Sequence, residues 1–380
     1  MKLLIKITGA VLLLAIALLA LGIGLSWAPD RPVDALKARW APPPSQFVTV
    51  EGMQVHLRDE GPRGDPLPIV LLHGTSASLH TWDGWVDALK GQRRVIRIDL
   101  PGFGLTGPAP DGDYTLPRYS RFMVALLDAL HLQRVVLAGN SFGGSVAWKT
   151  AVDHADRVAA LVLVDAAGYP YQSTSVPIGF RLARIPALAP VMANVLPRRM
   201  VEASVRNVYG DPSRITPGLI ERYYELTLRE GNRAALRARF EQSRGGEFAA
   251  EIPRVAAPTL ILWGGQDRLI PPSQGERFAT DIRGSRLVTF ADLGHVPHEE
   301  DPAPTVAAVQ RFLAGLPAGE RAAGLPAKER AAGLSAGAGA GAGADVSASA
   351  SEPASAFASP APPARVPADA PTASPAPETR

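Results

Sequence analysis

The sequence predicts an α/β fold, in which a mostly parallel sheet carries helices on both faces and is interrupted by one helical insertion. Short, wholly apolar runs at 69–72, 135–138 and 158–164 alternate with longer stretches whose apolar residues have helical spacing. Strands that are apolar throughout are buried on both faces, which is typical of a parallel sheet covered by helices. A chain of 380 residues is also long enough for one large domain with such a core.

The elements of this pattern follow one another along the chain. The predicted strands cover residues 46–50, 53–58, 69–72, 94–100, 135–138, 158–164, 259–263 and 286–290. The predicted helices of the sheet domain cover residues 82–90, 116–131, 144–149, 273–280 and 305–313. The first two strands are separated only by Glu51-Gly52 and therefore predict a hairpin. The later strands alternate with helices, so we expect them to run parallel.

A region of different character divides the core, which we assign to residues 46–167 and 253–314. Residues 168–252 are rich in arginine and proline, contain amphipathic helical segments such as 219–229, and show no strand pattern. We expect a helical cap that acts as a lid over a site, and the alternative is a packing excursion that never meets substrate. Residues 315–380 are rich in Ala, Gly and Pro, a composition that predicts a disordered tail.

The N-terminus predicts a membrane anchor in residues 1–28. Residues 7–28 carry no charge, and about 20 apolar residues are enough to span a bilayer as a helix. Lys2 and Lys6 precede this run, which favours a cytoplasmic N-terminus and an exported remainder, periplasmic or extracellular. The alternative is a cleaved signal peptide and a secreted protein, but Trp27 makes a poor small-residue cleavage site.

Composition narrows the other choices. Residues 29–45 contain five prolines and mixed charge, and predict a spacer between the anchor and the domain. The net charge of +3 is spread without clusters, so nucleic acid is not indicated as a partner. The absence of cysteine excludes disulfides, thiolate catalysis and cysteine-type zinc sites. A G-x-G-x-x-G match at 102–107 is flanked by prolines and opens no helix, which argues against a dinucleotide site.

The sharpest motif is Gly139-Asn140-Ser141-Phe142-Gly143, which lies between a predicted strand and a predicted helix. In such a turn the serine backbone is strained, and side chains at the two outer glycines would collide with the strand and the helix. The turn projects the Ser141 hydroxyl from the sheet edge and directs the Phe142 N–H beside it. Ser141 is therefore a candidate nucleophile, and the alternative is a tight structural turn with an incidental serine.

A serine nucleophile needs a base, and the base needs an orienting carboxylate. His295 follows the last predicted strand and Asp267 follows the strand before it. The carboxyl ends of parallel strands meet at one edge, so we expect both side chains near Ser141. His298 as the base and Asp165 as the acid are alternatives that the sequence leaves open.

Further residues complete the candidate site. Gly74, just after the strand at 69–72, lets the backbone approach closely, so the Thr75 N–H can join the Phe142 N–H in an oxyanion hole. We interpret His73 as a structural residue that ties loops together. The candidates for lining a substrate pocket are His80, Trp82, Tyr169 and Tyr171.

These motifs together resemble the α/β-hydrolase superfamily. The stretches that carry the resemblance occur in the expected order over about residues 46–314: His73-Gly74-Thr75, Asp99-Leu100-Pro101-Gly102-Phe103-Gly104, Gly139-Asn140-Ser141-Phe142-Gly143-Gly144, Gly264-Gly265-Gln266-Asp267 and Gly294-His295.

The resemblance implies an exported, membrane-tethered serine hydrolase that needs no cofactor and no metal. The expected activity is that of a carboxylesterase, with a small or medium apolar ester as the small-molecule substrate and an acyl-enzyme intermediate. A carbon–carbon bond hydrolase and a cofactor-free perhydrolase of the same fold are the alternatives. A ligand-binding module without turnover is the alternative that is not an enzyme.

Overall fold

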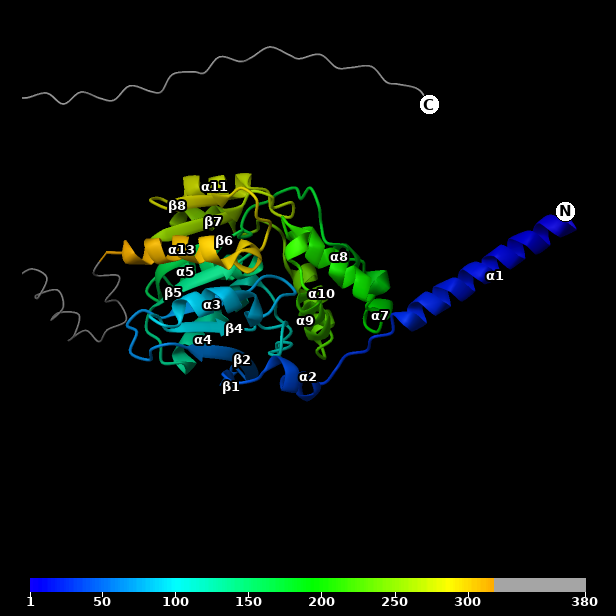
Figure 1. Cartoon of the computed structure of the whole chain (residues 1–380), viewed down its shortest axis with the longest axis horizontal. Helices are drawn as coiled ribbons and strands as arrows, with labels where there is room; N and C mark the ends of the chain where they lie inside the picture. The colour runs from blue at the N-terminus through cyan, green and yellow to red at the C-terminus, as the bar shows by residue number, and fades with distance from the viewer. Residues whose placement is uncertain (318–380) are drawn as a thin grey trace, which may run out of the picture. The chain divides into compact units, whose positions relative to one another are not determined.

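The structure is a computed structural model, and it describes residues 1–317. One eight-stranded sheet runs through the molecule (Figure 1). In spatial order its strands are β1 (Ser45–Val50), β2 (Met53–Glu60), β4 (Val95–Ile98), β3 (Ile69–Leu72), β5 (Val135–Asn140), β6 (Val158–Val164), β7 (Thr259–Gly264) and β8 (Arg286–Phe290). The β1–β2 and β2–β4 pairs are antiparallel, and the other pairs are parallel. The predicted fold class and the initial hairpin are confirmed.

Helices cover both faces of this sheet (Figure 1). The 3-10 helix η1 (Leu79–Trp82), α3 (Asp83–Leu89), α12 (Pro297–Glu300) and α13 (Pro302–Ala314) pack together on one side. The other face is covered by α4 (Leu116–Ala129), α5 (Phe142–Asp153) and α11 (Ser273–Asp281).

Strand β3 shows why the central strands are apolar throughout. Ile69 and Leu71 pack in the cluster that contains Trp85 of α3, and Val70 and Leu72 pack on the opposite face. All four strand side chains are fully buried. Each contributes about 1.5–3 kcal/mol relative to an exposed position. A polar residue at any position of this strand would therefore face a core.

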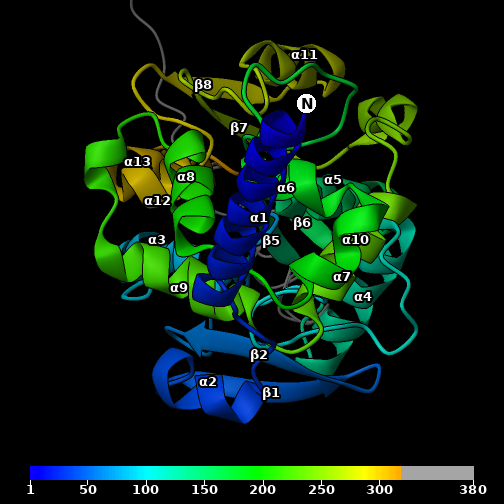
Figure 2. The same ribbon diagram turned by 90° about the vertical axis from the view of Figure 1, so that its right-hand side faces the viewer.

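The residues between β6 and β7 form a helical insertion, and its last turn ends at Arg254, two residues beyond the predicted boundary at 252. Its helices are α6 (Ile178–Ala183), α7 (Ala189–Met192), α8 (Arg198–Val208), α9 (Pro217–Thr227) and α10 (Asn232–Gln242), with 3-10 turns η2 (Pro186–Leu188), η3 (Pro212–Arg214) and η4 (Ala249–Arg254). This cap lies in front of β5 and β6 in Figure 2. The cap adds no strand to the sheet within the described residues.

The chain begins with the apolar helix α1 (Lys2–Leu25). Its segment Leu4–Leu25 is long and apolar enough to cross a membrane, and the most apolar stretch of it is not buried against the rest of the protein. By length and composition alone, an anchor and a signal sequence meet this description equally.

The segment 29–45 differs from the predicted spacer, because it packs on the domain. It contains the helix α2 (Val33–Trp40), whose Leu36 is only 2% exposed and packs with Leu105 and Leu226. The Arg31 N–H also donates to the Leu228 carbonyl at 2.6 Å. The prolines at 32 and 42–44 bound this helix instead of extending the chain. The apolar spacing Val33, Leu36, Trp40 was the signal for a packed helix.

The predicted tail, residues 315–380, lies outside the described residues except for its first three positions. Leu316 is buried in the same core cluster as Leu313 of α13. The packed core therefore extends at least two residues beyond the predicted boundary at 314.

Candidate active site

The turn at Ser141 has the strained geometry that the motif predicts. Ser141 lies between β5 and α5, as the N-cap of the helix, with φ 54° and ψ −116°, a region that non-glycine residues rarely adopt. A side chain at Gly139 would collide with the Gly143 carbonyl, and one at Gly143 would collide with the Leu72 carbonyl of β3. The crossing of strand and helix therefore requires both glycines.

His295 and Asp267 meet beside this turn. Asp267 follows β7 and His295 follows β8, and His295 Nδ1 lies 2.7 Å from Asp267 Oδ2. The other oxygen of Asp267 accepts the N–H groups of Leu269 and Ile270 at 2.8 and 2.9 Å, which fixes the carboxylate. With Nδ1 donating to this carboxylate, His295 Nε2 is free to accept a proton.

The two alternatives that the sequence left open take other positions. His298 is fully buried, places Nε2 3.1 Å from Thr81 Oγ1, and packs its ring 4.0 Å from that of Trp82. Burial lowers the pKa of His298 well below its usual range, so this imidazole stays neutral. Asp165 accepts the Gly264 N–H at 2.9 Å and does not bond to His295 within the described residues.

Asp165 nevertheless belongs to the same buried cluster. One ligand atom from each of Asp165, Asp267 and His295 lies within 4.8 Å of the others. Burial raises the pKa of Asp165 well above its usual range, and the neighbouring charge of Asp267 adds to this. Burial therefore disfavours the charged form of Asp165, and Asp267 is the carboxylate that bonds to His295.

Two backbone N–H groups near Ser141 have no partner among residues 1–317, namely those of Thr75 and Phe142. Phe142 is the first residue of α5, so its N–H has no acceptor within the helix. A side chain at Gly74 would lie 2.8 Å from the Asn140 amide oxygen, so this close approach requires glycine. Two free donors beside a serine can hold an oxyanion.

Two residues that sequence reasoning did not single out hold the histidine loop. The Asn140 side chain donates to the His295 carbonyl at 3.0 Å. The Glu300 carboxylate accepts the N–H groups of Gly294, Gly210 and Asp211 at 2.8, 3.0 and 2.7 Å, and so joins this loop to the cap. Asn140 stood within the motif, but Glu300 stood in an acidic run that carried no specific signal.

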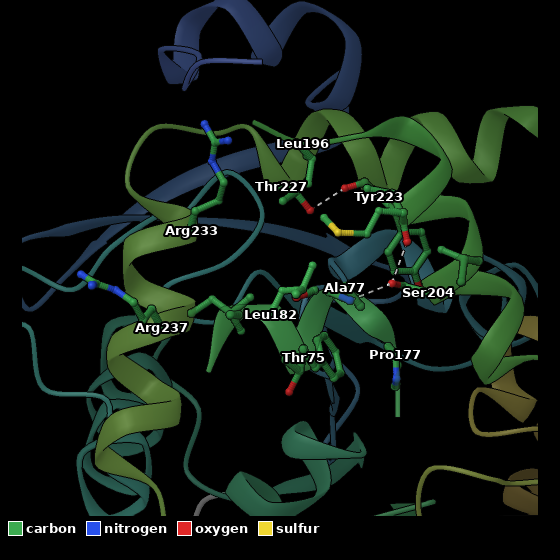
Figure 3. A pocket seen from close by; sticks show the side chains of 18 of the residues that line it. Thr75, Ala77, Pro177, Leu182, Leu196, Ser204, Tyr223, Thr227, Arg233 and Arg237 are labelled. Atoms are coloured by element: carbon green, nitrogen blue, oxygen red, sulfur yellow. Dashed lines mark hydrogen bonds between the residues drawn. The ribbon is translucent and has the colours of Figure 1, made fainter. Parts of the chain in front are cut away.

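A cavity of about 230 Å³ lies between the sheet edge and the cap (Figure 3). Ser141, His295 and Thr75 line it from the sheet side. Cap residues supply most of its wall, and most are apolar: Phe180, Leu182, Ala183, Ile185, Ala189, Met192, Ala193, Leu196, Met200, Val201, Val205, Val208 and Leu236. Arg233 and Arg237 of α10 are the charged cap residues on this wall.

None of the four residues predicted to line the pocket contributes to this cavity. His80 bonds to the Trp40 carbonyl, and burial lowers its pKa to about 3. Trp82 is fully buried against His298, and the Tyr169 hydroxyl donates to Asp281 at 2.8 Å. Tyr171 is 37% exposed and does not line the cavity. His80, Trp82 and Tyr169 are therefore packing residues, and the wall of the cavity comes mostly from small and aliphatic cap residues with no distinctive motif.

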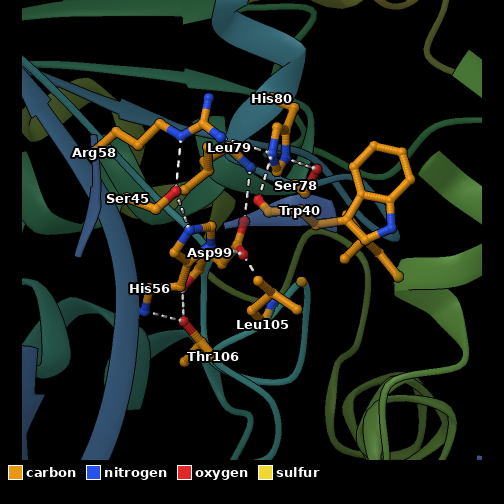
Figure 4. A network of polar contacts seen from close by, with 12 residues as sticks. Trp40, Ser45, His56, Arg58, Ser78, Leu79, His80, Asp99, Leu105 and Thr106 are labelled. Carbon is orange, nitrogen blue, oxygen red and sulfur yellow. Dashed lines mark hydrogen bonds and ion pairs between the residues drawn. The ribbon is translucent and has the colours of Figure 1, made fainter. Parts of the chain in front are cut away.

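A second Ser–His–Asp chain lies elsewhere in the molecule (Figure 4). His56 Nδ1 is 2.7 Å from Asp99 Oδ2, and His56 Nε2 is 2.9 Å from Ser45 Oγ. Ser45 also accepts a hydrogen bond from Arg58, and it does not line the cavity. Burial opposes the charge on Asp99, but the charges and hydrogen bonds of its histidine neighbours hold its pKa below the usual range. This chain links β1, β2 and β4, so we interpret it as structural.

Comparison with known proteins places this arrangement in a family. The model of the "alpha/beta hydrolase fold" family matches residues 68–302. The 2-hydroxymuconate semialdehyde hydrolase of Pseudomonas sp. (strain CF600) is 31% identical over 278 residues, which cover 70% of this chain and 93% of that protein.

Solved structures agree with the family match. A membrane phospholipase A, described as a bacterial virulence factor, is 25% identical with a TM-score of 0.63, over 83% of this chain and 99% of that one. A thermophilic esterase from Thermogutta terrifontis is 26% identical with a TM-score of 0.59, over 72% of this chain and 98% of that one. The chain therefore belongs to the α/β hydrolase fold family and is a hydrolase.

Proposed function

We propose that this hydrolase cleaves carboxylic esters with an apolar acyl group through an acyl-enzyme at Ser141. One observation carries the proposal: Ser141 is held in a strained turn at the wall of a mostly apolar cavity, beside two N–H groups that have no partner among residues 1–317. The His295–Asp267 pair lies at the same wall and supplies a base whose orientation is fixed.

The reaction uses these groups in sequence. Ser141 Oγ attacks the ester carbonyl carbon while His295 Nε2 takes the hydroxyl proton. The Thr75 and Phe142 N–H groups stabilise the oxyanion, and Asp267 stabilises the imidazolium. The intermediate then collapses, and His295 gives its proton to the leaving alcohol. Water attacks the acyl-enzyme with His295 again as the base, which releases the acid and restores Ser141.

No hydrogen bond joins Ser141 Oγ to His295 Nε2 within the described part of the chain. In enzymes without bound substrate, catalytic hydrogen bonds are often long and tighten when substrate binds. We expect the Ser141 hydroxyl and His295 Nε2 to form this hydrogen bond when an ester occupies the cavity.

The cavity supports a substrate with a small or medium apolar acyl chain. Its volume of about 230 Å³ lies near the lower end of ligand pockets, which are roughly 300–1,000 Å³. Its wall is mostly apolar, and the polar side chains on it are few, namely those of Asp30, Thr75, Ser76, Asn140, Ser204, Tyr223, Thr227, Arg233 and Arg237 beside the Ser141–His295 pair. Short and medium acyl chains should therefore bind better than charged or bulky ring systems.

We also propose that α1 is an uncleaved anchor and that the ester reaches the cavity from the membrane surface. Leu196, just after α7, donates its N–H to the Ser26 carbonyl at the end of α1. A membrane entered by α1 would therefore lie against the exposed apolar side chains of Trp27, Ile178 and Val191. The similarity to a membrane phospholipase A, which extends over more of this chain than the similarity to the esterase, supports this arrangement.

A fluorophosphonate probe tests the nucleophile in the full-length protein. We expect labelling of the parent and none of Ser141→Ala. Ser45→Ala is the matched control: Ser45 also belongs to a Ser–His–Asp chain, and its replacement should leave labelling unchanged. A parent that is folded and yet unlabelled would overturn the catalytic proposal, and labelling that persists in Ser141→Ala would move the nucleophile elsewhere.

Carbon–carbon bond hydrolysis is the second candidate, and it is supported by the similarity to 2-hydroxymuconate semialdehyde hydrolase. Both reactions would use the same serine, so labelling does not separate them. We expect a series of p-nitrophenyl esters to be hydrolysed with a dependence on chain length, and vinylogous diketones to be left intact. Faster turnover of a vinylogous diketone than of any ester would favour the second candidate.

A further inference from the structure

Arg239 is a buried charge for which the described residues supply no counterion. It lies in the cap helix α10 and is buried, with 6% of its surface exposed. No carboxylate pairs with it among residues 1–317, and its Nε atom has no hydrogen-bond partner there. Arginine is almost never so buried without a paired charge, because its desolvation is unfavourable. The position therefore calls for an explanation beyond packing.

The guanidinium group of Arg239 contacts both residues of the candidate oxyanion hole. Its Nη2 donates to Thr75 Oγ1 at 2.9 Å. Its central carbon lies 4.3 Å from the centre of the Phe142 ring. The free N–H groups beside Ser141 belong to these same two residues. Arg239 itself does not line the cavity, so we expect it to act through Thr75 and Phe142 and not by contacting the substrate.

The surroundings of Arg239 concentrate positive charge at this place. The guanidinium also stacks on Phe240 at 4.8 Å, and Arg184 stacks on the same ring at 4.8 Å. Burial lowers the pKa of Arg239 to about 10, and the charge of Arg184 contributes to this, so Arg239 stays protonated at neutral pH. Cation–π contacts with desolvated rings compensate part of the cost of burial.

We propose that Arg239 is a positioning residue of the oxyanion hole, which it builds in two ways. Its hydrogen bond and ring contact fix the Thr75 loop and the start of α5, so that both N–H groups aim at one point. Its fixed charge, placed in a region of low dielectric, also favours negative charge at that point. The inference rests on the proposed nucleophilic role of Ser141 and does not depend on the natural substrate.

This placement links the cap to the chemistry. Thr75 follows β3 and Phe142 begins α5, whereas Arg239 comes from the insertion. The oxyanion hole is therefore complete only when α10 is docked on the sheet domain. The cap thus contributes to transition-state stabilisation as well as to the wall of the cavity.

The test compares three arginine variants of the full-length protein. Arg239→Met removes the charge and keeps an apolar stem, and Arg239→Lys keeps the charge and loses the planar group. Arg199→Met is the matched control, because Arg199 is an exposed cap arginine with no ion pair among the described residues. Circular dichroism and thermal unfolding establish that each variant is folded before kinetics are compared.

We expect Arg239→Met to lower kcat on a soluble p-nitrophenyl ester about 10- to 100-fold, less than the roughly 100- to 1,000-fold loss from deleting an oxyanion donor. KM should change less than threefold, and Arg239→Lys should recover part of the loss. Affinity for an alkyl trifluoromethyl ketone, whose adduct carries an oxyanion, should fall by the same factor as kcat/KM. A purely structural role would not produce that proportionality.

Thr75→Val provides the coupling measurement. If Arg239 acts through Thr75, the double variant should lose clearly less than the product of the two single losses. Strict multiplicativity, or an unchanged kcat in Arg239→Met, would overturn the proposal. So would a rise confined to KM for anionic substrates, which would make Arg239 a substrate-binding residue.

The rate of fluorophosphonate labelling separates this inference from the ester proposal. The phosphonyl oxygen occupies the oxyanion position, so labelling of Ser141 should slow in Arg239→Met by a factor similar to that in kcat. This holds even if esters prove to be poor substrates. A labelled parent that hydrolyses no ester contradicts the ester proposal alone, and equal labelling rates in parent and Arg239→Met contradict the positioning role alone.

Discussion

Replacing Glu300 tests how the catalytic loop is held. Its carboxylate is 5% exposed and accepts three backbone N–H groups, one beside His295 and two at the end of the cap helix α8. The His295 N–H in turn donates to the Val208 carbonyl at 2.8 Å. One buried side chain therefore joins the histidine loop to the insertion, although it lies outside the cavity.

The size of the effect follows from the donors that lose their acceptor. Glu300→Ala leaves three N–H groups unsatisfied, and each buried orphan costs about 1–3 kcal/mol. Partial rescue by water and relaxation brings the expected loss of unfolding free energy to about 3–5 kcal/mol, as for other broken buried charge networks. Glu300→Gln keeps the volume and one acceptor oxygen, so we expect a loss of about 1–3 kcal/mol.

Urea unfolding of the full-length protein measures these losses, with kcat on a soluble ester measured in parallel. Because Gly294 precedes His295, kcat should fall in the order of stability, with Ala below Gln. Asp292→Ala is the control: Asp292 is an exposed acid in the same loop, and its loss should cost no more than about 0.5 kcal/mol. A loss below about 1 kcal/mol in Glu300→Ala would refute the reasoning.

Three further predictions follow from individual contacts. The pKa of His80 falls from about 6.5 unfolded to about 3 folded, so only the unfolded chain gains a proton between these values and stability drops as pH falls. Lowering the pH from 6.5 to 5 should therefore reduce the unfolding free energy of the parent by roughly 2 kcal/mol through His80. Urea unfolding of His80→Gln should show a loss smaller by that amount, and an equal loss in both proteins would contradict the prediction. Tyr169→Phe removes the hydrogen bond to Asp281 and should lower the unfolding free energy by about 1 kcal/mol. Ester kinetics should stay unchanged, and a changed KM would indicate that Tyr169 contacts the substrate. The double variant Ile178→Asp/Val191→Asp should hydrolyse an ester embedded in vesicles more slowly than the parent and a soluble ester at the same rate. Equal rates of parent and double variant on vesicles would contradict the proposal that the ester arrives from the membrane surface.

The sheet and the candidate triad were predictable because strong local signals specify them. A short, wholly apolar run such as 158–164 is typical of a strand that is buried on both faces of a sheet, and it forms β6. Parallel strands gather their carboxyl ends, so residues just after β5, β7 and β8 were bound to converge. The collisions at Gly139 and Gly143 are likewise a property of the turn itself. Chain order and local sterics were sufficient here.

The walls of the site and its supports were not predictable, because tertiary packing decides them. The cavity is lined by ordinary aliphatic residues such as Leu182 and Val205, which look in sequence like any amphipathic helix. The aromatic residues near the motifs were predicted to line the pocket because of their residue type, yet Trp82 packs in the core cluster that contains Trp85 of α3. Glu300 reaches the cap, and Arg239 reaches the oxyanion loop, through partners more than 80 residues away in the chain. No local pattern encodes such a pairing.

The insertion is better understood as part of the active site than as a detachable lid. It holds the histidine loop through the Val208 carbonyl and through Glu300, and it reaches the oxyanion loop through Arg239. Each of these contacts falls on a group adjacent to the reacting atoms. A cover that only enclosed substrate would affect KM when loosened, because the groups that bind the transition state would stay in place. Loosening this cap should instead lower kcat, since the base and the oxyanion donors lose their supports together.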